Sequence, residues 1–353
     1  MNPFWSQLAG ELAPYVPGEQ SRVANLAKLN TNESPFGPSP RALEAMRAAA
    51  SDTLRLYPDP EAAELREALA AHHGVTPEQV FVGNGSDEVL AHAFVALLKQ
   101  KRPLLFPDVT YSFYPVWAQL FGVAWQTVPL DGEMRVRVED YRRDAGSIVI
   151  ANPNAPTGIA LPHAEIARLL EEHRDIPVLV DEAYVDFGGE SAVPLIADHP
   201  NLLVVQTMSK SRALAGLRVG YALGDAGLIE ALRRVKDSFN SYPLGRIAQA
   251  GATVSVRDDA YFRESCARVI AGRDAMTREL VGLGFDVLPS RANFVFARHP
   301  ALGGAAFAAA LRERAILVRH FSKPRTVDWL RITVGTDDDI RRLIAAAAHI
   351  LGG

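Results

Sequence analysis

Residues 203–210 read Leu-Val-Val-Gln-Thr-Met-Ser-Lys, and residues 178–184 read Val-Leu-Val-Asp-Glu-Ala-Tyr. Each stretch is an apolar run, rich in β-branched residues, that ends in polar side chains. Such runs are typical of strands that are buried on both faces of a parallel sheet. Ligands bind at the carboxyl ends of strands in open sheets of this kind. Asp181 and Lys210 therefore stand where a binding site would form, although Asp181 alone could equally be a helix cap or a magnesium ligand, and Lys210 alone is usually a solvated loop residue.

The same pattern extends in both directions along the chain. Strands are predicted at 103–106, 147–151, 177–180, 202–206 and 218–223, with helices such as 162–173 and 226–237 between them. A long helical pattern from Ala260 to Leu283 ends at Gly284, a residue suited to a helix C-cap. Strands at 293–297 and 329–334 and helices at 305–314 and 338–351 follow it. This alternation predicts an α/β fold in two parts.

The first forty residues differ from the rest, because they are rich in Pro, Asn and Ser, as in the stretch 31–38, Thr-Asn-Glu-Ser-Pro-Phe-Gly-Pro. Such a segment forms neither a regular helix nor a central strand. We therefore predict an N-terminal arm (1–40), a large domain (41–256) with a mainly parallel sheet covered by helices, and a smaller α/β C-terminal domain (257–353).

Composition excludes several classes of function. The 353 residues include 37 Lys and Arg against 41 Asp and Glu, a formal charge of −4 without long blocks of one sign. This argues against a nucleic-acid or anionic-membrane surface. The single cysteine, Cys266, excludes an internal disulfide and a thiolate cluster, and the histidines have no metal-ligand spacing. No stretch approaches the roughly 18 apolar residues of a membrane span, so we expect a cytoplasmic protein without a metal site.

A third stretch, residues 81–88, reads Phe-Val-Gly-Asn-Gly-Ser-Asp-Glu and predicts a strand end, a glycine turn and the start of a helix. Free N–H groups at a helix start bind phosphate, although a plain turn is the commoner meaning of one Gly-x-Gly. Thr207, Ser209 and Arg218 also suggest an anion. Since strand ends converge, an anion site, a carboxylate and a lysine would share one cleft. That combination suits pyridoxal 5'-phosphate, a phosphorylated cofactor that forms a Schiff base with lysine.

With these motifs in place, the chain resembles the fold-type I aminotransferases of class I/II, and within them the histidinol-phosphate aminotransferases. The resemblance covers nearly the whole length. It rests on the motifs at 32–38, 57–59, 83–88, 111–114, 152–158 (Asn-Pro-Asn-Ala-Pro-Thr-Gly), 181–184, 209–210, 214–220 and 330–336.

The resemblance implies roles for the catalytic residues. Lys210 would form the Schiff base with the cofactor and then move the proton between the substrate and the cofactor. Asp181 would keep the pyridine nitrogen protonated, Tyr184 would donate to the ring's 3-oxygen, and Tyr111 would stack on the ring.

It also implies how the cofactor phosphate and the substrate are held. The phosphate ligands would be Gly85, Ser86, Asp87, Thr207, Ser209 and Arg218, with Tyr57 reaching in from the second subunit of a homodimer. Arg331 would pair with the substrate carboxylate. Arg319 would line the same end, and Tyr15 would help to cover the substrate.

One position departs from the family pattern. The family usually has an Asn directly before Pro-Thr-Gly, whose amide donates to the 3-oxygen, and here this residue is Ala155. Either Asn154 supplies the amide, Tyr184 acts alone, or the pKa of the Schiff base differs from that of the family.

We expect transamination between an amino donor and a 2-oxo acid, with histidinol phosphate and 2-oxoglutarate giving imidazole acetol phosphate and glutamate. An aromatic amino acid aminotransferase and a lyase of the threonine-phosphate decarboxylase type remain open. The aminotransferase-like sensor domain of some transcription regulators would need an added helix-turn-helix domain, for which 353 residues leave no room.

Overall fold

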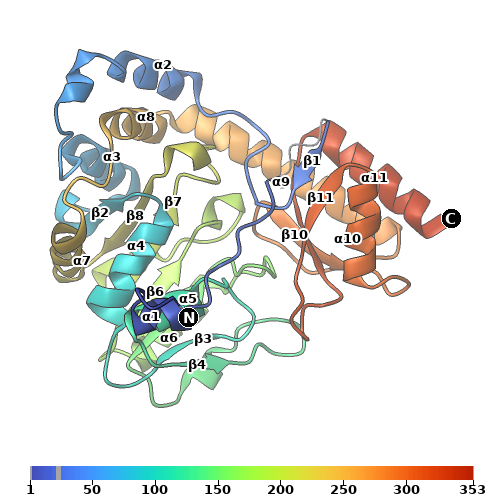
Figure 1. Ribbon diagram of the computed structural model, residues 1–353, viewed down its shortest axis with the longest axis horizontal. Coiled ribbons are helices and arrows are strands. Elements are labelled where there is room, and N and C mark those ends of the chain that lie inside the picture. Colours follow the sequence, from blue (N-terminus) through green and yellow to red (C-terminus); the bar gives the residue numbers. More distant parts are fainter. Residues whose placement is uncertain (1, 21–24, 353) are drawn as a thin grey trace.

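The structure is a computed structural model that describes residues 2–20 and 25–352, and this part of the chain forms two β-sheets (Figure 1). The larger sheet has seven strands in the order β2-β8-β7-β6-β5-β3-β4. Their bounds are β2 (Val80–Gly83), β3 (Leu104–Pro107), β4 (Trp125–Val128), β5 (Ser147–Ala151), β6 (Val178–Asp181), β7 (Leu202–Thr207) and β8 (Gly220–Gly224).

The larger sheet is parallel except for β8, which is antiparallel to both β2 and β7. The prediction that a strand begins at Arg218 is wrong, because this residue has a left-handed backbone (φ 54°) and precedes the strand. Strand β4 was not predicted, because it lies at the sheet edge and three of its four residues, Trp125 to Thr127, are exposed. An edge strand of this kind lacks the apolar run that identifies a buried one.

Helices cover both faces of this sheet, which explains why its central strands are apolar throughout. Leu202 and Val204 pack on one face and Leu203 and Val205 on the other. The first face is covered by α3 (Ala63–His73), α6 (His163–Glu172) and α8 (Arg246–Arg257), and the second by α4 (Ser86–Ala93), α5 (Tyr114–Phe121) and α7 (Ala226–Phe239).

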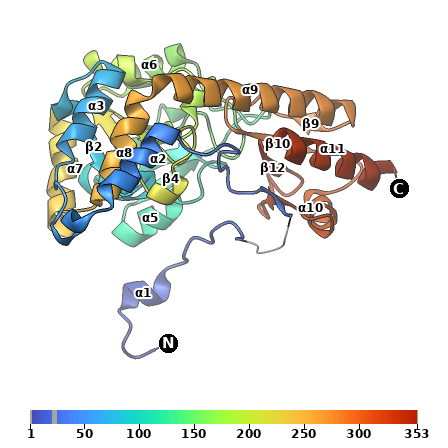
Figure 2. The same cartoon turned by 90° about the horizontal axis from the view of Figure 1, so that it is seen from above.

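The long helix α9 (Asp259–Gly282) links the two sheets, and Figure 2 shows it running from the helices of the first to the strands of the second. The second sheet has the order β1-β11-β12-β10-β9. Its strands are β1 (Ala27–Leu29), β9 (Asp286–Val287), β10 (Phe294–Arg298), β11 (Ile316–His320) and β12 (Leu330–Thr333). It shares one core with α9, α10 (Gly304–Glu313) and α11 (Asp337–Gly352).

The predicted arm is more regular than expected. It contains the short helix α1 (Gln7–Glu11), which projects from the molecule in Figure 2, and the edge strand β1, which pairs in parallel with β11. Residues 1 and 21–24 of the arm lie outside the described residues. Helix α2 (Pro40–Ala49) follows it. Short 3-10 segments are η1 (Asp52–Arg55), η2 (Pro77–Gln79), η4 (Val138–Tyr141), η5 (Val185–Phe187), η6 (Val193–Ala197) and η7 (Ala215–Leu217), and the π-helical η3 (Phe94–Leu98) continues α4.

None of the helices in the described part of the chain combines the length and the apolar character needed to cross a membrane.

Candidate active site

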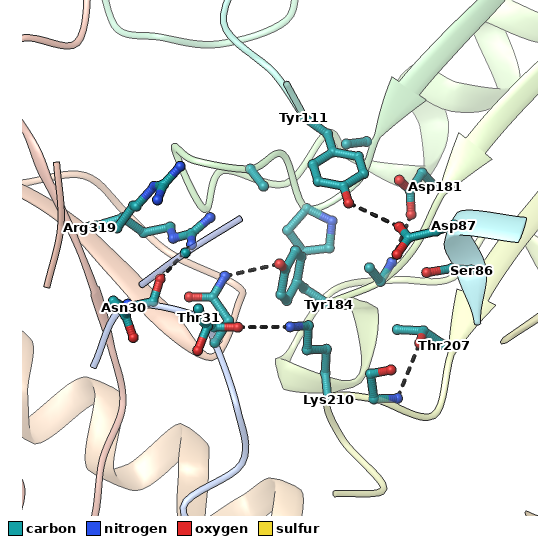
Figure 3. A pocket seen from close by; sticks show the side chains of 18 of the residues that line it. Asn30, Thr31, Ser86, Asp87, Tyr111, Asp181, Tyr184, Thr207, Lys210 and Arg319 are labelled. Carbon is teal, nitrogen blue, oxygen red and sulfur yellow. Dashed lines mark hydrogen bonds between the residues drawn. The ribbon is translucent and has the colours of Figure 1, made fainter. Parts of the chain in front are cut away.

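A cavity lies at the ends of β5, β6 and β7, next to the start of α4 (Figure 3). Strands β11 and β12 of the second sheet and residues 30–32 also line it. We call residues 30–32 the strap. Most of the predicted site residues line the cavity. They are Tyr15, Ser86, Asp87, Tyr111, Asp181, Tyr184, Thr207, Ser209, Lys210, Arg218, Arg319 and Arg331. Residues from distant parts of the sequence are therefore brought to one place, as the convergence of strand ends predicts.

Lys210 follows β7, and its Nζ donates a hydrogen bond to the carbonyl oxygen of Thr31 in the strap (3.0 Å, Figure 3). Burial lowers the pKa of this amine to about 8, and the positive charge of Arg331 acts in the same direction. A neutral amine is therefore accessible close to physiological pH.

Asp181 is the last residue of β6 and is 5% exposed. The hydroxyl of Tyr114 donates to its Oδ2 (2.8 Å), and the N–H of Ala183 donates to its Oδ1 (3.3 Å). Burial raises the pKa of Asp181 to about 6 despite these donors. A cationic ligand beside it would reverse that effect. Tyr114 has no role in the sequence prediction, although it belongs to the quoted motif 111–114.

The start of α4 forms a polar cup against β8. Gly85 has a left-handed backbone (φ 85°), and a Cβ on it would lie 2.4 Å from Nη2 of Arg218. A Cβ on Gly220 would lie 2.2 Å from the backbone N of Ser86. Gly220 is needed for this close approach of two backbones, and Gly85 for its positive φ. The guanidinium of Arg218 contacts Oδ2 of Asp87 (3.3 Å) and Oγ of Ser209 (3.4 Å).

Two tyrosines line this cavity. The hydroxyl of Tyr111 donates to Oδ1 of Asp87 (3.0 Å). The ring of Tyr184 packs edge-on against Phe294, with centroids 5.1 Å apart, and its hydroxyl oxygen accepts a hydrogen bond from Nδ2 of Asn32 (2.9 Å). Asn32 also lines the cavity. Sequence reasoning assigned it no role, although it opens the motif at 32–38.

Two arginines of the second sheet line the cavity at the end where this sheet forms its wall. Arg319 and Arg331 are directly paired residues of β11 and β12. Arg331 donates from Nη2 to the carbonyl oxygen of Asn30 (3.0 Å), and burial lowers its pKa. Its buried Nε has no hydrogen-bond partner in the described residues. An unpartnered buried donor is costly, so this end fits an anionic ligand.

Three predicted residues do not line the cavity. Gly85 shapes the turn below it. Tyr57 is 79% exposed and stacks on Tyr242 (centroids 4.7 Å apart). The amide of Asn154 does not reach the cavity, because its Nδ2 donates to Val109 O (3.0 Å) and Thr157 Oγ1 (3.1 Å) and its Oδ1 accepts from Thr110 Oγ1 (2.8 Å). The methyl group of Ala155 lines the cavity in its place.

The fold and the cavity together define a class: an enzyme that holds a phosphorylated aldehyde cofactor between a half-buried lysine, a buried carboxylate and a helix start. The chain belongs to the family described as aminotransferase class I and II, whose sequence model matches residues 24–346. It is therefore a pyridoxal 5'-phosphate-dependent aminotransferase.

Individual relatives are similar over nearly their whole length. Histidinol-phosphate aminotransferase 2 of Rhizobium meliloti strain 1021 is 62% identical over 351 residues, covering 99% of this chain and 100% of the relative. Histidinol-phosphate aminotransferase 2 of Thiobacillus denitrificans is 63% identical over 344 residues, covering 97% and 96%. The solved structure of a histidinol-phosphate aminotransferase from Sinorhizobium meliloti, in complex with pyridoxal 5'-phosphate, superposes with a TM-score of 0.88 at 27% identity, covering 99% and 98%.

Proposed function

We propose that this chain is a homodimeric aminotransferase that interconverts histidinol phosphate plus 2-oxoglutarate and imidazole acetol phosphate plus glutamate. The observation that supports this choice of substrate is the pair Arg319 and Arg331 at one end of the cavity. The identity of about 60% to proteins named histidinol-phosphate aminotransferase supports the same reaction.

The residues present fit the cofactor. The uncapped first turn of α4 and the cup formed by Ser86, Ser209 and Arg218 suit its phosphate. The carboxylate of Asp181 suits its pyridine nitrogen, the aromatic face of Tyr111 suits its ring, and the hydroxyl of Tyr184 suits its 3-oxygen. When bound, the cofactor supplies a protonated ring that accepts the electron pair of the substrate α-carbon.

Lys210 is the residue that would hold the cofactor covalently and move the proton. Its lowered pKa leaves the amine partly neutral near pH 7 to 8, which a base at the substrate α-carbon requires. The carbonyl oxygen of Thr31 accepts a hydrogen bond from this amine and so helps to orient it within the cavity. Asp181 would hold the ring nitrogen, where its negative charge would favour a proton.

The paired arginines explain the choice of substrate. Histidinol phosphate carries a phosphate ester at the position where an amino acid carries its carboxylate. A phosphate dianion has more charge and more acceptor oxygens than a carboxylate, so it suits two guanidinium groups. Glutamate has its α-carboxylate at this position, and Arg331 alone is enough to pair with it. Tyr15, stacked on Phe113 (centroids 4.5 Å apart), would cover the bound substrate.

The dimer is proposed from exposed apolar residues in the arm and near Tyr57. Phe4 is 93% exposed and Trp5 59% exposed, and Leu54, Leu56 and Tyr57 form a second exposed apolar stretch. A surface with these features fits a second copy of the chain, which would bring Tyr57 into the partner's cavity.

The domain boundaries at 40/41 and 256/257 and a location in the cytoplasm also stay proposals. The first boundary is supported by Met46 of α2, which packs against the large-domain core, and the second by that core ending at Val256. The buried free Cys266 fits a reducing compartment.

Half-reactions followed by the absorbance of the bound cofactor test the substrate. We expect histidinol phosphate and glutamate to react faster than phenylalanine. Arg319→Gln should weaken histidinol phosphate by about tenfold or more and glutamate much less. Faster reaction with phenylalanine would favour an aromatic amino acid aminotransferase. Release of carbon dioxide from a phosphorylated amino acid, without exchange of its amino group, would favour the lyase.

A further inference from the structure

Asn32 in the strap connects the second sheet to the cavity. It is 1% exposed. Its Nδ2 donates to the hydroxyl oxygen of Tyr184 (2.9 Å), and its Oδ1 accepts from Oγ1 of Thr333 at the end of β12 (3.0 Å). Its backbone N–H donates to the same Thr333 oxygen (3.0 Å), and its carbonyl accepts from Nδ2 of Asn293 (3.0 Å). The side chain is therefore held at both ends.

In the structure the amide has one orientation. The hydroxyl of Thr333 accepts from the backbone N–H of Asn32 and donates its single proton to Oδ1 of the same residue. The NH2 group then faces Tyr184. Since the oxygen of Tyr184 receives this hydrogen bond, its own proton is left to point elsewhere in the cavity.

The neighbouring position has no group that could do this. Ala155 and Phe294 pack against the ring of Tyr184, and Ala155 offers only a methyl group. The nearby amide of Asn154 is fully engaged with Val109, Thr110 and Thr157. Among the described residues, Asn32 is thus the amide that contacts the Tyr184 hydroxyl.

We propose that Asn32 is a positioning residue, which directs the hydroxyl proton of Tyr184 onto the 3-oxygen of the cofactor and so does through Tyr184 what position 155 cannot do directly. This inference rests on the proposed placement of the cofactor. The chain Thr333, Asn32, Tyr184 runs in one donor direction from the second sheet into the cavity, and each hydrogen bond polarises the next. Donation from Asn32 also opposes the rise in the Tyr184 pKa that burial causes, which makes the phenol a better donor.

The consequence is measurable in the bound cofactor. A hydrogen bond to the 3-oxygen draws negative charge away from that oxygen. The nitrogen that Lys210 contributes, beside this oxygen, then holds its proton less tightly. Removing the Asn32 amide should therefore raise the pH midpoint at which the cofactor's visible absorbance changes.

The experiment is a pH titration of that absorbance in the cofactor-loaded, substrate-free enzyme. We expect Asn32→Ala to raise the midpoint by about half a pH unit or more, and Thr333→Val to raise it less, because it removes only the polarising donor. Asn32→Asp keeps the acceptor for Thr333 and removes the donor, so it should give the largest rise. The negative charge that Asn32→Asp adds would also raise the midpoint. The test of the inference therefore rests on the neutral variants Asn32→Ala and Thr333→Val.

Asn293→Ala is the matched control. It removes a buried hydrogen bond to the same strap residue but leaves the chain of donors intact, so it should lower the melting temperature and leave the midpoint unchanged. An unmoved midpoint in both Asn32→Ala and Thr333→Val would overturn the inference, as would an equal rise in Asn293→Ala. If the unaltered protein forms no lysine-bound chromophore with the cofactor, the proposed function itself fails and this inference with it.

Discussion

At the scale of single residues, the charge state of the cavity depends on what is buried beside each group. Asp181 is buried and Lys210 and Arg331 are half-buried, and their removal from water shifts the pKa of each group in the direction that favours its neutral form. The cofactor-free protein therefore carries charged groups in an unfavourable environment, which a ligand of complementary charge would relieve.

Lys210→Ala should abolish transamination, because it removes both the covalent attachment and the base. The cofactor should still bind through the phosphate cup, but borohydride reduction should no longer fix it to the protein. Peptide mapping after reduction checks the attachment, and exposed Lys101→Ala serves as the control. Labelling of any other lysine in the unaltered protein would contradict the assignment.

Asp181→Asn should stabilise the cofactor-free protein while it slows the enzyme. Burial raises the pKa of Asp181 from 3.8 to about 6, so the folded protein binds this proton more tightly than the unfolded chain does. The free energy of unfolding then falls as the pH rises through this interval, and the full cost is present above about pH 6. The variant removes that cost.

At about pH 8 the gain in the free energy of unfolding should be roughly 3 kcal/mol. It should shrink toward zero near pH 3, where Asp181 is mostly protonated in both states. Urea unfolding at both pH values measures the difference. A gain of equal size at both pH values would show that the carboxylate charge is not its cause.

At the scale of elements, the cup depends on how closely β8 approaches the start of α4. Gly220→Ala would place a Cβ 2.2 Å from the backbone N of Ser86, so the helix start must shift. We expect the affinity for pyridoxal 5'-phosphate to fall by about tenfold or more, since phosphate ligands depend on position. Equilibrium dialysis measures the loss. Gly216→Ala, where an added Cβ has open space, is the control and should bind normally.

Elements differed in how well the sequence predicted them. Strands β5, β6 and β7 are buried on both faces, and their apolar runs placed them to within a residue. Strand β4 is exposed at an edge, and β1 has only three residues, so neither carries a local signal. Likewise, Asp181 ends one apolar strand and Lys210 follows another, so their place at the strand ends could be predicted. The contact of Asn32 with Tyr184 joins residues 152 positions apart, which no local pattern reveals.

At the scale of the whole molecule, the proposed dimer makes a prediction about shared sites. If Tyr57 acts in the partner's cavity, one subunit with Lys210→Ala and one with Tyr57→Ala form a dimer with one intact site. Mixing the two variants after dissociation should therefore restore activity to about a quarter of that of the unaltered enzyme. Activity equal to the sum of the separate variants would place Tyr57 outside the partner's site.

The parallel pairing of β1 with β11 places Ala27 beside Ile316, so a strand near the start of the chain pairs with one near its end. During synthesis the strap and β1 leave the ribosome first, but their partner strand leaves it almost last. The larger sheet lies between them in the chain and can pack while β1 is still unpaired. Because Thr31 and Asn32 follow β1 directly, the cavity around Lys210 takes its final form only after the C-terminal strands have been made. A nascent chain released before β11 would thus contain the lysine, the carboxylate and the phosphate cup, but not the strap contacts that complete the site.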